Sequence, residues 1–157
     1  MQVNKLGFPI KETEELVVEL NTLLANFQVY YQNLRGIHWN IKGKRFFELH
    51  LKFEELYNDA QIKVDLIAER VLTLGGTPLH TFEDYIKHNK LEIGKNITKD
   101  VDSVEIIIKS ISVLLTLERS ILKNADEIGD EGTNSMMSDF IQEQEKTLWM
   151  MEAWLSE

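Results

Sequence analysis

Five side chains of types that bind metal ions stand between residues 38 and 69: His38, His50, Glu54, Asp65 and Glu69. Two imidazoles and three carboxylates, with no thiolate among them, suit iron or manganese, and zinc can also accept them. Glu54 follows His50 by four residues, and Glu69 follows Asp65 by four, so each pair would share one face of a helix. An ordinary solvated helix surface is the alternative for any one such pair. Together, the five residues favour a metal site.

Four long amphipathic helices are predicted to carry these residues. Apolar side chains recur at three- and four-residue steps in residues 13–39, 46–74 and 101–128 and again near the end of the chain. Thr133 or Ser135 can cap the last of these four helices. Residues 78–100 are less periodic and are expected to form a crossover, with a short helix in the sequence TFEDYIKH. Two helical hairpins joined by one long crossover describe the ferritin-like variant of the four-helix bundle, an all-α fold.

The two histidines are expected at one end of this bundle, because His38 ends the first helix and His50 begins the second. Taken alone, His38 also fits a hydrogen-bonded core histidine. His50 and Asp65 are fifteen residues apart on one helix, or about 22 Å at 1.5 Å per residue, so one ion cannot bind both in one chain.

Two arrangements remain for the five residues. Either they form unrelated half-sites, or an antiparallel second subunit brings its Asp65 and Glu69 to His38 and His50 across a two-fold axis, which creates two equal sites. An in-bundle di-iron site is disfavoured because it uses Glu-x-x-His motifs, and none occurs in the sequence.

Composition restricts the class of protein. The chain has 157 residues, no cysteine and a net charge of −9, which excludes disulfides and argues against a broad basic surface for nucleic acid. Neither a signal peptide nor an apolar run long enough for a membrane span is recognisable. We expect a cytoplasmic protein with one domain over residues 1–157, of which residues 1–12 form a short N-terminal tail.

Several sequence motifs resemble those of the Dps-type mini-ferritins. They are HWN at 38–40, FFELH at 46–50 with Glu54, DLIAERVLTLGG at 65–76 and TLWMMEAWL near the end of the chain. The resemblance covers nearly the whole chain, and the joint spacing His-x11-His-x3-Glu-x10-Asp-x3-Glu is specific. The family commonly has Asp where Glu54 stands, and the extra methylene of Glu54 lengthens the reach of its carboxylate.

The resemblance implies a four-helix subunit with a short extra helix in the crossover, assembled as a hollow homododecamer. It also implies an intersubunit, di-iron-type ferroxidase centre in which His38, His50 and Glu54 of one subunit face Asp65 and Glu69 of another. Such a centre would oxidise Fe(II), with hydrogen peroxide favoured over dioxygen, store Fe(III) as a mineral and protect against oxidative stress. Trp39 would be a redox neighbour of the centre, although packing is the commoner role for an aromatic residue at a helix end.

Other polar residues have weaker interpretations. Candidates for an acidic entry pore are Asp126, Asp130, Glu131 and Asp139, with a solvated loop as the alternative; the family often has an acidic residue where Ser135 stands. His80 and His88 are interpreted as surface residues. Glu118 falls on the apolar stripe of its helix, where an arginine partner is the hypothesis.

Two other functions compete with the ferroxidase. A nucleoid-associated DNA-binding protein with incidental metal binding is disfavoured by the acidic balance and by a tail with only Lys5 and Lys11 as basic residues. A purely structural helical bundle is disfavoured by the spacing of the five ligand-type residues.

Overall fold

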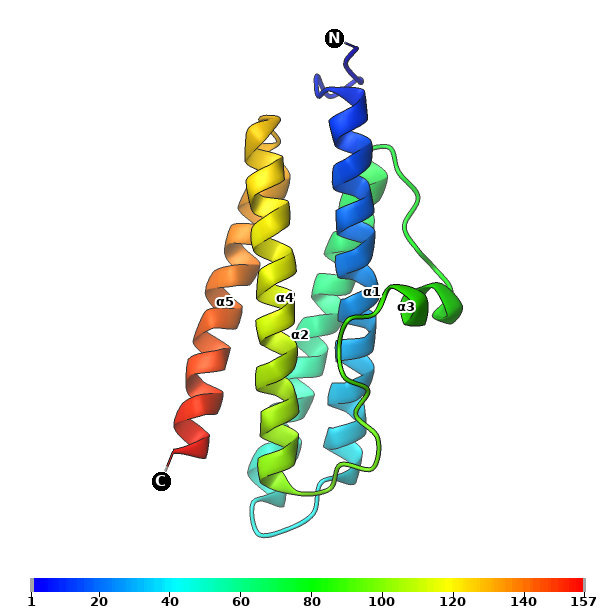
Figure 1. Ribbon diagram of the computed structural model, residues 1–157. Helices are drawn as coiled ribbons and strands as arrows, with labels where there is room; N and C mark the ends of the chain where they lie inside the picture. Colours follow the sequence, from blue (N-terminus) through cyan, green and yellow to red (C-terminus); the bar gives the residue numbers. More distant parts are fainter. Residues whose placement is uncertain (1, 157) are drawn as a thin grey trace.

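The computed structural model describes residues 2–156, and its regular structure there is helical apart from one isolated bridge between Val3 and Pro9. The helices are α1 (Ile10–Asn40), α2 (Phe46–Thr73), α3 (Phe82–His88), α4 (Asp100–Glu127) and α5 (Glu131–Leu155). In Figure 1, α1 and α2 form one hairpin, α4 and α5 form the other, and the crossover from α2 to α4 carries α3 along the outside of α1. The predicted all-α, ferritin-like bundle with a short crossover helix is confirmed. No helix in residues 2–156 is long and apolar enough to cross a membrane.

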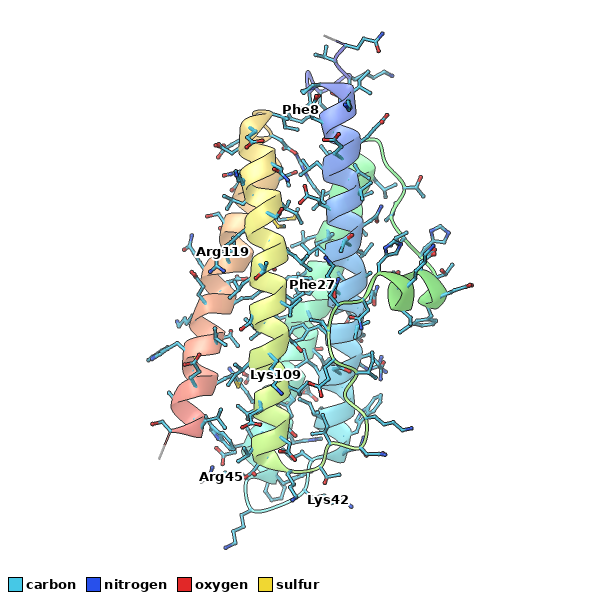
Figure 2. The ribbon with its side chains drawn as sticks, viewed as in Figure 1. Phe8, Phe27, Lys42, Arg45, Lys109 and Arg119 are labelled. Carbon is cyan, nitrogen blue, oxygen red and sulfur yellow. The ribbon has the colours of Figure 1, made fainter. Side chains whose placement is uncertain are left out.

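Apolar side chains from the four long helices fill the bundle along its length. Leu20, Phe27, Phe53, Ile111 and Met137 are fully buried, with at most 1 % of their surface exposed. Phe27 lies at mid-height between the helices in Figure 2, and its ring meets the edge of Phe140 with centroids 6.0 Å apart. The spacing of these residues placed one stripe of each helix inside, which is the usual origin of helix stability in a bundle.

Three asparagines on α1 fix the path of the crossover. Asn21, Asn26 and Asn33 each donate from their amide nitrogen to one backbone carbonyl of the crossover and accept a backbone N–H with their amide oxygen, at 2.7–3.3 Å. Asn26 and Asn33 are buried. A segment that lacks regular structure thereby satisfies part of its backbone, which a buried loop must do.

The first and last helices begin earlier than predicted. α1 starts at Ile10 rather than at Thr13, because Pro9 adopts an extended conformation at the N-cap and Thr13 donates its hydroxyl back to the Pro9 carbonyl at 2.6 Å. α5 starts at Glu131, so the predicted caps Thr133 and Ser135 are wrong.

Asp130 caps α5 instead. Its carboxylate accepts the Thr133 N–H at 3.0 Å and an Arg70 N–H at 2.6 Å, and it is completely buried. A side chain held in this way ties α5 to α2. It does not line a pore, so that prediction for Asp130 is also wrong.

Candidate metal centre

The turn between α1 and α2 brings the two histidines together. α1 ends at Asn40, and the Ile41 N–H caps it by donating to the Ile37 carbonyl at 3.0 Å. Gly43 has a φ of +126°, a conformation that favours glycine because it has no Cβ. The chain reverses over residues 41–45 and enters α2 at Phe46, at the end of the bundle where Figure 2 labels Lys42 and Arg45.

His38 and His50 hold each other through reciprocal hydrogen bonds. His38 Nδ1 lies 2.6 Å from the His50 carbonyl oxygen, and His50 Nδ1 lies 2.7 Å from the His38 carbonyl oxygen. A carbonyl oxygen can only accept, so each Nδ1 carries the proton and donates it. In the neutral ring each Nε2 then keeps a free lone pair, which is the arrangement that second-shell hydrogen bonds impose on metal-binding histidines.

Aromatic packing fixes the orientation of both rings. The imidazoles stack with centroids 3.8 Å apart and planes within 10°. Phe46 stacks on His50 at 4.8 Å, and the edge of Tyr57 meets His38 at 5.2 Å. His38 is buried, with 6 % of its surface exposed, and His50 is partly buried. The rings are therefore held in place before any ligand arrives, and little conformational freedom is left to lose on binding.

Glu54 adds a carboxylate to this histidine pair. Its Oε1 lies 3.8 Å from His38 Nε2, and its side chain is about half exposed. One turn of α2 separates Glu54 from His50, so both side chains lie along the same face of the helix. His38, His50 and Glu54 are the three predicted ligands that the structure brings together.

Asp65 and Glu69 are exposed farther along α2 and do not join the three. Among residues 2–156, no group of three or more His, Asp or Glu side chains of this one chain is arranged to hold a metal ion. The residues present nevertheless fit a metal in their chemistry, because two free imidazole lone pairs and a carboxylate oxygen are ligands for a divalent ion. Within the described residues, these three side chains alone do not form a metal site.

Comparison with known proteins places this fold in a family. Residues 17–157 match the ferritin-like domain family. The chain is 37% identical over 148 residues, covering 94% of it and 93% of the relative, to the DNA protection during starvation protein of Porphyromonas gingivalis. It also matches the crystal structure of the Dps protein from Vibrio cholerae O1, described as a member of a broad superfamily of ferritin-like diiron-carboxylate proteins. That match has a TM-score of 0.97 and 47% identity and covers 99% of this chain and 98% of the other.

The chain belongs to the ferritin-like family, as a Dps-type mini-ferritin. A Dps structure from Bacillus brevis superposes with a TM-score of 0.91 at 32% identity, over 99% of this chain and the whole of that one. The resemblance inferred from the motifs at 38–40, 46–50 and 65–76 is therefore confirmed.

This Dps-type subunit exposes large apolar side chains on the α2 face that carries Asp65 and Glu69. They are Phe47, Leu51, Ile62, Leu66 and Leu72, each 45–83% exposed. At 100° per residue they occupy one side of the helix, interleaved with the two carboxylates. Several exposed large apolar side chains on one side of a helix are typical of an interaction surface. This face was not predicted, although the apolar residues outside the core stripe of α2 are visible in the sequence.

Trp39 lies directly after His38 and is 56% exposed. The Arg35 guanidinium lies 4.9 Å from the Trp39 ring centroid and 5.1 Å from that of Tyr31, which is a favourable cation–π distance. The indole is therefore held beside the histidine pair while much of it remains open to solvent.

The remaining sequence candidates lie elsewhere on the subunit. Asp126, Glu131 and Asp139 are exposed near the α4–α5 turn and on the first turns of α5, as the pore prediction requires. His80 and His88 are exposed, which agrees with their interpretation as surface residues. Glu118 accepts a hydrogen bond from Gln144, so the hypothesis of an arginine partner is wrong.

Proposed function

We propose that this Dps-type mini-ferritin oxidises Fe(II) at a site shared by two subunits and stores the Fe(III) product inside a hollow homododecamer. The observation that carries the proposal is the reciprocal hydrogen bonding of His38 and His50. It leaves two oriented Nε2 lone pairs beside Glu54 in a chain that does not complete the site. Membership of the ferritin-like family supports iron storage and protection against stress as the biological role.

The missing ligands come from a neighbouring subunit in this proposal. Asp65 and Glu69 lie about 22 Å and more from His50 along α2, because each residue adds about 1.5 Å. The exposed apolar α2 face around them would be covered by the same face of a second copy. An isologous contact pairs each end of α2 with the opposite end of its partner, so it forms two identical sites. His38, His50 and Glu54 of one subunit then meet Asp65 and Glu69 of the other.

The chemistry of the site follows from its ligands. Imidazole and carboxylate groups bind Fe(II) and also stabilise the more highly charged Fe(III) product. Two Fe(II) ions supply the two electrons that reduce one hydrogen peroxide to two waters, with two protons consumed. Delivering both electrons at one site avoids release of a hydroxyl radical, which is the protective part of the function. Dioxygen is the alternative oxidant, and we propose hydrogen peroxide as the preferred one.

Trp39 is proposed to reduce any hydroxyl radical that forms at the site. When a single Fe(II) reduces peroxide, one electron is missing and a hydroxyl radical forms. An indole next to His38 can supply that electron, with its N–H proton, and convert the radical to water. Its position and partial exposure support this role.

The experiment that tests the site is stopped-flow oxidation of Fe(II) by hydrogen peroxide, after anaerobic Fe(II) titration, on the assembled protein. His50→Ala removes one Nε2 ligand and a hydrogen-bond partner of His38, and we expect both the Fe(II) stoichiometry and the fast phase of oxidation to be lost. His80→Ala is the matched control, because His80 is exposed and its Nδ1 contacts only the local Pro78 carbonyl in the structure. Equal rates in all three proteins would refute the site.

A further inference from the structure

A second group of polar side chains lies in the middle of the bundle. Each long helix contributes one member: Tyr30 from α1, Lys63 from α2, Glu118 from α4 and Gln144 from α5. All four are buried, and Glu118 has no exposed surface. Acidic side chains are almost never fully buried without a partner that satisfies them. The bonding of Glu118 therefore needs an explanation that the metal site does not supply.

Glu118 and Gln144 are joined by one hydrogen bond, and each has one oxygen that lacks a hydrogen-bond donor. Gln144 Nε2 donates to Glu118 Oε1. The other oxygen of each group, Glu118 Oε2 and Gln144 Oε1, is buried and has no partner; within residues 2–156 these are the only two such side-chain atoms. Both unpartnered atoms belong to the same pair, and both are oxygens.

One proton on Glu118 would give both unpartnered oxygens a hydrogen bond. An ionised carboxylate can only accept, so it leaves both oxygens unsatisfied, at a cost that is large for a buried polar atom. A carboxylic acid protonated at Oε2 is a donor, and the Gln144 amide oxygen is the acceptor that lacks a donor. We propose that Glu118 is a neutral carboxylic acid in the native subunit and forms a two-point acid–amide pair with Gln144 that fastens α4 to α5.

The charged groups around the pair agree with a neutral Glu118. Lys63 Nζ is already held by Asp59 at 2.5 Å and Glu143 at 2.7 Å, so its charge is balanced without Glu118. Arg119 is exposed and pairs with Glu145 of α5, 2.9 Å away, and Figure 2 shows it on the side of α4 where α5 lies. Among the described residues, neither cation forms an ion pair with Glu118.

The ionisation energetics point the same way. Desolvation by burial raises the pKa of Glu118 to about 8, against smaller lowering effects of the Gln144 hydrogen bond and of Lys63 and Arg119. The remaining titratable neighbour, Tyr30 on α1, keeps its proton because burial raises its pKa as well, with the Asp59 charge adding to the effect. A protonated Glu118 thus lies among a neutral phenol, a neutral amide and a compensated ammonium.

A neutral Glu118 would make the bundle core a poor site for a metal ion. Ferritin-like proteins with a metal site in the bundle core use ionised glutamates on facing helices. Here the core layer offers one carboxyl group that carries a proton, and the Lys63 ammonium occupies the position between the neighbouring carboxylates. The core therefore holds a proton rather than a metal ion.

Infrared spectroscopy of the assembled wild-type protein tests the protonation state directly. A protonated carboxyl group has its own C=O stretching band, which glutamate-specific ¹³C labelling shifts. We expect one labelled band at about pH 7, well above the ordinary glutamate pKa near 4.3, and its loss at about pH 10. The band should be missing from Glu118→Gln and present in Glu145→Gln, an exposed control on α5. Absence of the band from the wild type would overturn the proposal, and this measurement needs no variant to fold.

Thermal unfolding as a function of pH provides the second readout. A carboxyl group whose pKa is raised in the folded state binds its proton more tightly there, so stability falls as pH rises from the ordinary glutamate value through about 8. The wild-type Tm should fall over this range, and the Tm of Glu118→Gln should fall less, because the new amide donates to Gln144 Oε1 at every pH. Parallel Tm profiles for both proteins, or a large loss of Tm in Glu118→Gln at pH 7, would show that Glu118 is ionised.

Discussion

The hairpin end of the bundle and its middle both bury polar side chains, but the middle encloses them, whereas the hairpin end leaves ring nitrogens available for a ligand. In the middle, Glu118 and Gln144 are enclosed on all sides, and at the opposite end of the bundle Arg70 pairs with the buried Asp130 carboxylate at the α5 N-cap. At the hairpin end, His38 and His50 satisfy each other's backbone through Nδ1 and leave Nε2 free beside an exposed glutamate. Burial of a polar group therefore does not mark a binding site. A lone pair that the chain orients and then leaves open does.

The open end also differs from the closed middle in what completes it. Each closed group has its partner on another helix of the same chain. The histidine pair has no further carboxylates within reach among the described residues, and those that match it in sequence lie exposed on an apolar face of α2. In the proposed function the histidine pair depends on a second subunit for its remaining ligands, whereas the buried polar groups stabilise the subunit itself.

The largest effect is expected from breaking the proposed subunit contact. Leu66→Glu places a charge in the exposed apolar face of α2, where a second copy would desolvate it without a partner. We expect the assembly to split and Fe(II) oxidation to be lost together, although no ligand has changed. Size-exclusion chromatography with light scattering, combined with the oxidation assay, measures both. Thr116→Glu, at an exposed position of α4, is the control; a Leu66→Glu protein that stays assembled and active would contradict the proposed interface.

Breaking a buried polar pair should lower the free energy of unfolding rather than abolish Fe(II) oxidation. Arg70→Met leaves the fully buried Asp130 carboxylate without its cation, and breaking a buried ion pair costs about 3–5 kcal/mol. Because Arg70 is partly exposed and Asp130 keeps its cap bonds to Thr133, we expect about 3 kcal/mol. Arg119→Met breaks the exposed pair with Glu145 and should cost about 0–1 kcal/mol. Urea unfolding of both variants measures the difference, and equal losses would refute the distinction between the two pairs.

A smaller effect is expected beside the open site. Trp39→Phe keeps an aromatic ring but removes the indole, so the rate of Fe(II) oxidation should change little. When Fe(II) is added in less than the site stoichiometry with excess peroxide, the variant should release more hydroxyl radical. Spin-trap electron paramagnetic resonance detects that radical. An unchanged yield would assign Trp39 to packing and to its contact with Arg35.

The smallest effect concerns DNA. The chain has a net charge of −9, and residues 1–12 offer only Lys5 and Lys11 as basic groups to neutralise phosphates. Nonspecific affinity depends on the number of phosphates that are neutralised. We expect no band shift of duplex DNA in a gel at about physiological salt. A stable band shift at that salt concentration would contradict this expectation and would favour the DNA-binding function.

Local features were predictable from the sequence and distant pairings were not. The hairpin that joins His38 to His50 follows from helix period and a glycine-containing turn, which are properties of neighbouring residues. The acid–amide pair of Glu118 depends on the register between α4 and α5, and the cap at Asp130 depends on Arg70 arriving from α2. No local pattern contains that information. Asp130, Thr133 and Ser135 were also chemically equivalent as caps until the backbone path selected one.

Mixing two inactive variants tests the shared site most directly. One variant carries His38→Ala and His50→Ala, and the other carries Asp65→Ala and Glu69→Ala. In an isologous interface between one copy of each, one site has all five of its ligands and the other keeps only Glu54. Random co-assembly should therefore restore about a quarter of the wild-type sites, because about half of the interfaces are mixed. Recovery of Fe(II) oxidation in the mixed assembly, with each parent inactive, is the predicted result. A mixed assembly as inactive as its parents would show that the five residues do not form one intersubunit site.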